Sequence, residues 1–271
     1  LHRVDRRQRQ MCIRDRLEKV LWGYSAQTYT DFEIVIADDG SGEETRRRIE
    51  ELKALIAIPI VHVWHEDDGF QKTKILNKAI LAARSDYLIF TDGDCVPRKD
   101  FVATHMQYRE PGYFLSGGYF KLPMDISKAI TKEDILQQRC FDLNWLKARG
   151  FKSSIKSLKL TAKGVGAKML NALTPTKATW NGANASGWKA DLLASNGFNE
   201  EMQYGGEDRE LGERLMNMGL SSKQIRYSAI CVHLDHARGY VSEEAWKKND
   251  AIRAHTKANK LTKTPNGIKS V

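Results

Sequence analysis

Two acidic clusters in this 271-residue chain have the residue types and spacing of a metal or phosphate site. Asp38-Asp39 and Asp92-Gly93-Asp94 each follow a short apolar run. Two carboxylates separated by one residue can converge on Mg²⁺ or Mn²⁺, and such ions in turn bind phosphate oxygens. Each cluster alone has a plainer interpretation as a solvated turn, because Asp and Gly are common turn residues.

Two further groups could move a proton or complete a metal site. Glu207 and Asp208 follow two glycines at an expected helix start, where a carboxylate acts either as a general base or as a cap for the helix. His233 and His236 follow a strand in the last part of the chain. A lone histidine is more often structural, but a histidine beside an Asp-x-Asp site is a reasonable further metal ligand.

Alternating elements position the first two clusters. Helices from Leu17, around Ile49 and at 72–83 alternate with strands at 31–37, 60–64 and 87–91. This order is typical of βαβ units in a mostly parallel sheet, which predicts an α/β fold. Ligands of such sheets bind at the carboxyl ends of the strands, and both acidic clusters fall there.

The second half of the chain is less regular. The pattern predicts a strand or hairpin at 112–121, helices at 131–149, from 191 and at 207–218, and a strand at 225–232. These elements divide the chain into five expected regions. They are a disordered arm (1–16), a first ordered half (17–110), a connecting region (111–190), a second ordered half (191–256) and a flexible tail (257–271).

Three segments together resemble the family-2 glycosyltransferases with the GT-A nucleotide-diphospho-sugar fold, over about residues 17–110 and 178–240. FEIVIADDGS is similar to the strand that ends in the family's nucleotide-contacting acidic pair, and LIFTDGDCVP to its metal-binding DxD segment. NGFNEEMQYGGEDRELGERLMNMG resembles the acceptor-side segment of galactosyltransferase-like and chondroitin-polymerase-like members. The resemblance implies a Rossmann-like sheet with helices on both faces. It also implies that residues 17–110 are the nucleotide-sugar-binding half and that residues 191–256 are the acceptor and catalytic half.

On the donor side, the resemblance implies that Asp38 and Asp39 lie by the uracil and ribose of a UDP-sugar. It places Lys74 near the nucleotide and Asp92 at the ribose or the metal. The implied cofactor is Mn²⁺ or Mg²⁺.

On the metal and acceptor side, the resemblance makes Asp94 and His233 the metal ligands, with His236 as the less favoured histidine. Asp208 becomes the base that deprotonates the acceptor hydroxyl, and Glu207 binds the acceptor.

The chain departs from the family pattern at two places. Tyr204 stands where the subset usually has Trp, and it joins Trp180 and Trp188 as a candidate for lining the acceptor pocket. The family normally begins with an apolar strand, but residues 1–16 hold six arginines and could not form it without burying unpaired charge. We therefore expect a first strand to be missing and residues 1–16 to be foreign to the natural protein.

The formal net charge of +9 is concentrated in one segment. Residues 143–190 carry nine Lys and Arg and no acidic residue, interspersed with apolar side chains. This cationic amphipathic segment is interpreted either as a contact with an anionic membrane surface or as a solvated lid or linker. The chain has no membrane-spanning apolar run, and its four separated cysteines fit the reducing cytoplasm.

The resemblance implies a metal-dependent inverting transfer of a sugar from a UDP-sugar to a hydroxyl of a glycan or lipid-linked glycan. The expected setting is cell-envelope polysaccharide synthesis in the cytoplasm, with peripheral attachment to the inner face of the plasma membrane.

Two other functions fit parts of the sequence. A haloacid-dehalogenase-like phosphatase would use Asp92 as nucleophile and Asp94 as acid, but that loop usually follows the first strand of its domain. A basic nucleic-acid-binding protein would use Trp145, Phe151 and Trp180 among the cations of the 143–190 segment. No recognised binding module is present, so nucleic acid is not an expected partner.

Overall fold

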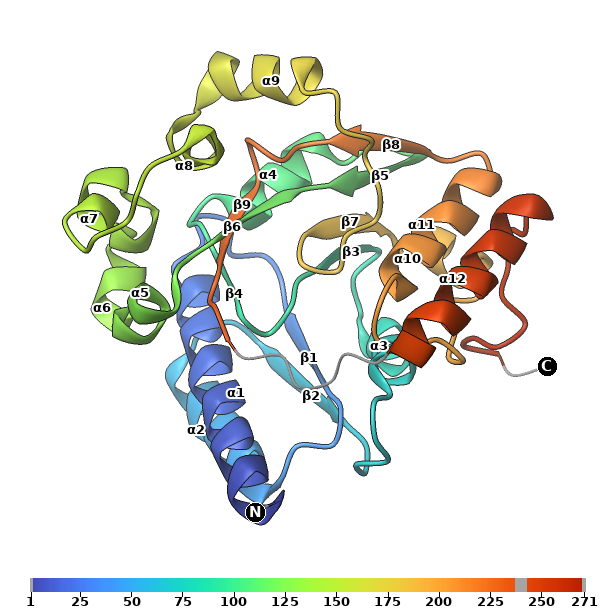
Figure 1. Ribbon diagram of the computed structural model, residues 1–271, viewed down its shortest axis with the longest axis horizontal. Helices are drawn as coiled ribbons and strands as arrows, with labels where there is room; N and C mark the ends of the chain where they lie inside the picture. The colour runs from blue at the N-terminus through green and yellow to red at the C-terminus, as the bar shows by residue number, and fades with distance from the viewer. Residues whose placement is uncertain (1, 237–242, 270–271) are drawn as a thin grey trace.

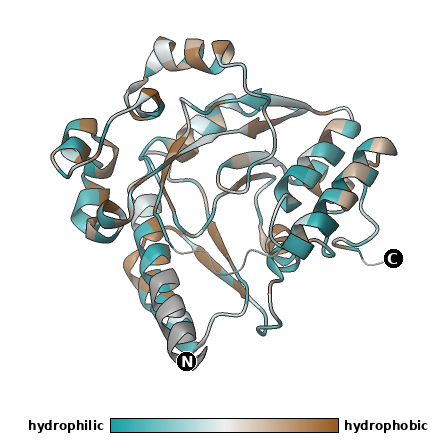
Figure 2. Ribbon diagram, in the orientation of Figure 1, coloured by the Kyte–Doolittle hydropathy of each residue, from teal (hydrophilic) through white to brown (hydrophobic). Residues whose placement is uncertain are grey.

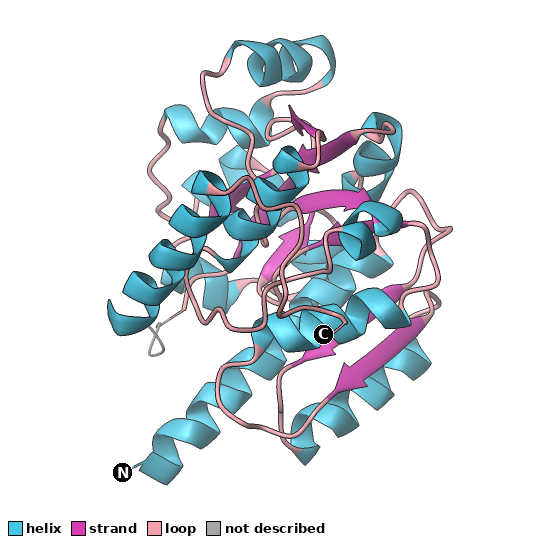
Figure 3. Ribbon diagram, turned by 90° about the vertical axis from the view of Figure 1, so that its right-hand side faces the viewer, coloured by secondary structure: helices cyan, strands magenta, loops and turns pink. Residues whose placement is uncertain are grey.

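The computed structural model describes the backbone of residues 2–236 and 243–269, and the side chains from residue 14 onward within those ranges. Within them, three small sheets form the centre of the molecule, and helices lie around them on several sides (Figure 1). The view from the side shows strands enclosed between helices, which confirms the α/β class (Figure 3).

The first sheet positions the first acidic cluster. Strand β1 (Ile34–Asp38) pairs in parallel with β2 (Ile60–Trp64), and α2 (Glu43–Leu55) connects the two. Helix α3 (Lys72–Ala82) packs against this pair. Because β1 ends at Asp38, the acidic pair lies at the carboxyl end of a parallel strand, as the sequence predicts.

The other two sheets mix strand directions. The second has the order β3 (Tyr87–Phe90), β7 (Ala185–Trp188), β5 (Tyr113–Ser116) and β8 (Ser221–Gln224). The third has the order β4 (Cys95–Pro97), β9 (Ile230–His233) and β6 (Gly118–Lys121). Strand β7 runs antiparallel to both of its neighbours and β4 runs antiparallel to β9. The described sheets are therefore mixed rather than mostly parallel.

The remaining helices surround these sheets. They are α1 (His2–Ser25), α4 (Phe101–Tyr108), α5 (Met124–Ala129), α6 (Lys132–Leu136), α7 (Leu143–Lys147), α8 (Leu158–Thr161), α9 (Gly164–Leu173), α10 (Lys189–Ala194), α11 (Glu207–Asn217) and α12 (Glu243–Ala258), with 3-10 turns at Arg139–Phe141 and Ile155–Ser157. Among the described residues, none of these helices has the length and apolar character needed to cross a membrane.

The N-terminal arm differs from its prediction. Helix α1 begins at His2, so residues 2–16 are helical rather than disordered. Arg and Gln are good helix formers, and adding turns to an existing helix costs little once residues 17–25 are docked. Val20, Leu21 and Tyr24 are buried as the apolar spacing predicts. Within the described residues, α1 is followed by β1, and no strand precedes it.

Two other expectations need correction. The helix predicted at 131–149 is broken into α6, a 3-10 turn and α7, because Gln138 adopts a left-handed conformation with φ of 59°. The tail predicted to be flexible is packed as far as residue 269. Thr264 is 3 % exposed, Ile268 packs against buried apolar residues, and the carbonyl of Asn266 accepts a hydrogen bond from the backbone N–H of Glu200.

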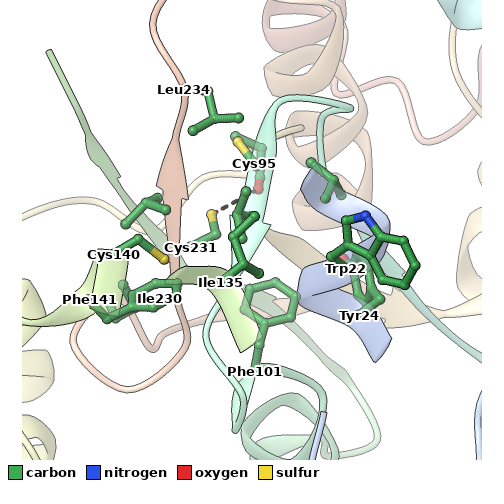
Figure 4. Close-up of a cluster of buried hydrophobic side chains, with 14 of the residues drawn as sticks. Trp22, Tyr24, Cys95, Phe101, Ile135, Cys140, Phe141, Ile230, Cys231 and Leu234 are labelled. Carbon is green, nitrogen blue, oxygen red and sulfur yellow. Dashed lines mark hydrogen bonds between the residues drawn. The ribbon is translucent and has the colours of Figure 1, made fainter. Parts of the chain in front are cut away.

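Two buried apolar clusters hold the site-bearing strands in place. The larger joins α1, α4, α6, β4 and β9, and includes Trp22, Phe101, Ile135 and Cys231 (Figure 4). The smaller surrounds Trp180, which is completely buried. Burying each large apolar side chain contributes about 1.5–3 kcal/mol, so β4 and β9 form a rigid base for the residues at their ends.

Candidate active site

Asp94 and His233 meet at the ends of two paired strands. Asp94 directly precedes β4, and His233 is the last residue of β9. The antiparallel register places Cys95 opposite His233, and the backbone carbonyl of Asp94 accepts a hydrogen bond from the N–H of Leu234 at 2.9 Å. Sheet pairing thus brings together two residues that lie 139 positions apart in the sequence.

Both histidines of the sequence motif reach Asp94. Nε2 of His236 lies 2.9 Å from Oδ2 of Asp94, and Nε2 of His233 lies 3.6 Å from the same oxygen. The two imidazole rings stack with centroids 5.8 Å apart. Donor atoms of all three side chains lie within 4.8 Å of one another. The structure therefore brings His236 to the cluster as well as the favoured His233.

The donor set fits a divalent metal ion. Burial would raise the pKa of Asp94, but the hydrogen bond from His236 and the charges of His233 and His236 hold it below its usual value. Asp94 is therefore an ionised, acceptor-only carboxylate. Nδ1 of His233 is buried and has no hydrogen-bond partner among the described residues. One carboxylate and two imidazoles are suitable ligands for Mn²⁺.

Asp38 is held by a histidine of the neighbouring strand. Nε2 of His62, on β2, lies 2.8 Å from Oδ2 of Asp38, and Ser41 donates to both carboxylate oxygens. Burial would raise the pKa of Asp38, but these hydrogen bonds keep it below its ordinary value. His62 carries no motif in the sequence, and only its register opposite Ile36 brings it beside Asp38.

Asp39 connects β1 to the start of α3. One of its oxygens lies 2.7 Å from Nε2 of His65, and the other accepts a hydrogen bond from the backbone N–H of Gln71 at 2.9 Å. Gly40 has a φ of 79°, and a Cβ atom there would lie 2.5 Å from the Cα atom of Asp67. This close approach of two loops requires glycine.

Lys72 links the second acidic cluster to the third. Its Nζ atom lies 3.2 Å from Oδ1 of Asp92 and 3.4 Å from Oε1 of Glu207. Partial burial would lower the pKa of Lys72, but the carboxylates of Asp92, Glu207 and Asp208 raise it well above its usual value. The amine therefore stays protonated. A donor atom of Asp92 also lies within 4.8 Å of one on Asp94, which continues the cluster to the metal-binding group.

Lys74 does not join this cluster. It is exposed on α3, whereas Lys72 two residues earlier faces Asp92. Residues two apart on a helix do not share a face, so a shift of two positions changes which lysine reaches the site. The family resemblance predicts that Lys74 lies near the nucleotide. Lys74 is on the helix that contributes to the cluster, but it lies on a different face of that helix from Lys72.

The start of α11 is built on two glycines. The side chain of Glu207 is buried and accepts a hydrogen bond from the backbone N–H of Gly205, while Gly206 caps the helix in a left-handed conformation. A Cβ atom on Gly205, whose φ is 115°, would lie 2.7 Å from the ring of Trp246. The capping interpretation is thus partly correct, because Glu207 stabilises this turn as well as contacting Lys72.

Asp208 lies beside Lys72 across a glycine. Its Oδ2 atom accepts a hydrogen bond from the backbone N–H of Gly182 at 2.9 Å. A Cβ atom on Gly182 would lie 3.5 Å from Nζ of Lys72 and 3.6 Å from that same Oδ2 atom. Gly182 therefore borders both side chains.

Aromatic rings border the same region. Tyr204 makes edge-to-face contacts with Phe70 and Trp246, at centroid distances of 6.1 and 6.3 Å. Trp246 is 39 % exposed. Trp180 lies in the core, and Trp188 packs edge-on against Tyr87, so neither belongs to this aromatic group. Phe70 and Trp246 had no distinguishing signal in the sequence.

Comparison with known proteins shows a family similarity in the first part of the chain. Residues 11–119, which include Asp38, Asp39, Lys72, Asp92 and Asp94, match the model described as Glycosyl transferase family 2. Over these residues the chain resembles glycosyl transferase family 2. This similarity favours a glycosyltransferase over the phosphatase and nucleic-acid-binding alternatives.

Two curated proteins are similar to most of the length of this chain. It is 26 % identical over 239 residues to the chondroitin synthase of Escherichia coli, and 24 % identical over 237 residues to the hyaluronan synthase of Pasteurella multocida. Each match covers 84 % of the chain, but only 33 % and 23 % of the relatives. The chain therefore spans about a third or less of these two enzymes.

Solved structures agree on the fold of this chain. The mannosyltransferase PcManGT from Pyrobaculum calidifontis superposes with a TM-score of 0.54 at 18 % identity, covering 83 % of this chain and 55 % of that one. TarS of S. aureus in complex with UDP-GlcNAc gives 0.54 at 15 % identity, covering 90 % and 65 %. The similarity to these GT-A structures confirms the expected fold.

Proposed function

We propose that the protein transfers a sugar, with inversion, from a UDP-sugar to a hydroxyl group of a glycan or glycolipid. The observation that carries the proposal is one continuous set of contacts. It runs from His233 and His236 through Asp94 and Asp92 to Lys72. From Lys72 it continues to the carboxylates at the start of α11. A cation-binding group and a candidate base thus lie on either side of one lysine.

The donor assignment has support from related structures. TarS was solved with UDP-GlcNAc, GalNAc-T7 with UDP, GalNAc and Mn²⁺, and PcManGT with GDP-Man and Mn²⁺. We assign Asp38 and Asp39 to the nucleoside of the donor, since both are ionisable groups at the carboxyl end of β1 and are fixed by His62 and His65.

Asp94, His233 and His236 would hold the metal ion. When bound, Mn²⁺ or Mg²⁺ neutralises the negative charge that develops on the departing diphosphate. Lys72 adds a permanent positive charge next to Asp92.

Asp208 is the proposed general base. Its carboxylate takes the proton of the acceptor hydroxyl while the hydroxyl oxygen forms a bond to the anomeric carbon. The bond from that carbon to the β-phosphate oxygen breaks, and UDP leaves with the electron pair. A single displacement of this kind inverts the anomeric centre. Glu207 and the aromatic group of Phe70, Tyr204 and Trp246 are proposed to bind the acceptor.

We further propose that the acceptor is a growing polysaccharide or its lipid-linked precursor, used at the cytoplasmic face of the plasma membrane. The matches to a chondroitin synthase and a hyaluronan synthase support a polysaccharide acceptor.

A panel of nucleotide sugars tests the proposal. The melting temperature of the protein is measured with UDP-, GDP- and dTDP-sugars, each with and without Mn²⁺, and release of free UDP is then followed with glycan acceptors. The proposal expects stabilisation by a UDP-sugar in the presence of Mn²⁺ and acceptor-dependent UDP release. Stabilisation by GDP- or dTDP-sugars alone would reject the assignment of the donor.

A further inference from the structure

Helix α9 presents its apolar face to solvent. It packs on the molecule through Ala167 and Asn171, which are buried. Val165, Met169 and Leu173, spaced four residues apart, are 73 %, 56 % and 72 % exposed. A helix on the surface of a soluble protein normally turns such a stripe toward the core. No described residue covers this one.

The preceding turn extends the same exposed apolar surface. Ile155 is 85 % exposed and Leu158 is 42 % exposed, just before and at the start of α8. Helices α8 and α9 lie together at the outer edge of the molecule, and α9 carries hydrophobic colour on that edge (Figure 2). We call Ile155, Leu158, Val165, Met169 and Leu173 the α8–α9 surface.

Lysines surround this surface without acidic partners. Exposed lysines alternate in sequence with the apolar residues of this surface; they are Lys152, Lys156, Lys163, Lys168 and Lys177. No described acidic side chain forms an ion pair with any of them, and residues 143–190 contain no Asp or Glu. An exposed apolar patch with an unbalanced cationic rim is the combination that binds the interface of an anionic bilayer.

The segment is anchored on its inner side, which argues against a loose linker. Asn171 donates to Oγ of Ser228 at 2.8 Å and accepts from the backbone N–H of Tyr227. Lys159 donates to the backbone carbonyl of Tyr119. These contacts hold one face of the segment against the body of the protein, so the apolar residues on the opposite face point to solvent. A lid that closes over the site would instead need its apolar stripe turned inward.

A second copy of the chain is a poor partner for this surface. A symmetric contact would place one lysine rim against an identical rim, and like charges across an interface are unfavourable. An anionic bilayer satisfies both features, because apolar side chains enter the acyl boundary while lysines extend their amines to the headgroups.

We propose that the α8–α9 surface docks the protein on an anionic lipid bilayer. The α8–α9 surface would be the contact that holds the protein at the cytoplasmic face of the plasma membrane, the location proposed above. It does not depend on sugar transfer, because lipid binding is measured without turnover. Failure of the two proposals is therefore distinguishable.

Vesicle co-sedimentation tests the docking. The full chain is mixed with vesicles of phosphatidylcholine alone, or with about one third phosphatidylglycerol, at low and high salt. Wild type is expected to sediment with the anionic vesicles at low salt and to be released as salt rises. Equal binding to both vesicles, or binding to neither, overturns the proposal.

Matched variants locate the contact. The triple variant Val165→Gln, Met169→Gln, Leu173→Gln should lose roughly tenfold or more in binding. The exposed control pair Leu55→Gln, Leu81→Gln should bind like wild type.

The charge is tested in the same way. The pair Lys156→Gln, Lys168→Gln should lower binding by roughly tenfold, since each basic residue near an anionic surface contributes up to about fivefold. The control pair Lys260→Gln, Lys263→Gln removes the same amount of charge from exposed positions near the C-terminus, and it should change vesicle binding little. Equal losses in test and control variants overturn the proposal. Sedimentation velocity tests whether the surface instead joins two copies of the chain. The proposal is also overturned if wild type forms a dimer that the apolar triple variant abolishes and wild type does not bind lipid.

Discussion

The ammonium group of Lys72 lies 3.2 Å from the carboxylate of Asp92. Asp92 belongs to the loop after β3, on the proposed donor side, and the same amine lies 3.4 Å from Glu207 at the start of α11. One cation thus joins two segments that are more than 100 residues apart in the chain. This link is the centre of the proposed site.

Removing the charge of Lys72 should disable the site. In Lys72→Met, three carboxylates lose their shared cation and repel one another, so turnover should fall at least about 100-fold. Steady-state kinetics with a UDP-sugar measures the effect. Lys74→Met on the same helix serves as the comparison, because Lys74 is exposed. A larger loss in Lys74→Met than in Lys72→Met would favour the sequence assignment over the structural one.

Asp208 should be needed for turnover and dispensable for donor binding. Asp208→Asn keeps the shape of the side chain and its hydrogen bond from Gly182, but it cannot accept a proton, so kcat should fall by about 10²–10⁴. Calorimetric titration with UDP should give an unchanged Kd. The exposed Asp125→Asn variant is the control. Full activity of Asp208→Asn would remove it as the base.

The glycine turn before α11 should tolerate no side chain. Gly205→Ala places a Cβ atom 2.7 Å from the ring of Trp246, in addition to the strain of a positive φ. Gly112→Ala has the same kind of φ strain and open space around the Cβ atom. Thermal unfolding should therefore show Gly205→Ala to be less stable than Gly112→Ala by about 1–3 kcal/mol. Equal melting temperatures would mean that Trp246 moves aside freely.

Stability should depend on pH through His105. Burial lowers the pKa of His105 to about 4, and its ring hydrogen-bonds to Ser186 and Asn184. The unfolded chain binds this proton near pH 6.5, so the free energy of unfolding should fall by about 2 kcal/mol between about pH 7.5 and about pH 5.

Urea unfolding at the two pH values measures this difference. His105→Gln should reduce the pH-dependent part, whereas His255→Gln, an exposed control, should retain it. If His105→Gln shows the same pH dependence as wild type, another group is responsible.

The local pattern of the sequence was enough to predict β1, β2, α3 and the acidic clusters at strand ends. Its apolar periods indicate which residues face a core, and Val20, Leu21, Ile49 and Leu52 are buried in the structure as those periods predict. The same periods do not specify which lysine of α3 faces Asp92, because that depends on how the helix is rotated on the sheet. Lys72 was missed for this reason.

Long-range pairing explains the other differences. His62 reaches Asp38 only through the register of β2 beside β1, and a single sequence carries no signal for that register. Strand β7 arrives late in the chain and inserts antiparallel beside β3, so a rule based on consecutive βαβ units predicted too many parallel pairs. From the sequence, Trp180 is a candidate for lining the acceptor pocket, but it is buried in the smaller apolar cluster.

The most direct test of the proposed function is a calorimetric titration of UDP into wild type and Asp94→Asn, each with and without Mn²⁺. Asp94 contributes a ligand oxygen next to both histidines, so wild type should bind UDP tightly only with Mn²⁺. Asp94→Asn should lose at least about tenfold in that Mn²⁺-dependent affinity. Equal UDP affinity with and without Mn²⁺ in wild type, or full Mn²⁺-dependent binding by Asp94→Asn, would contradict the account.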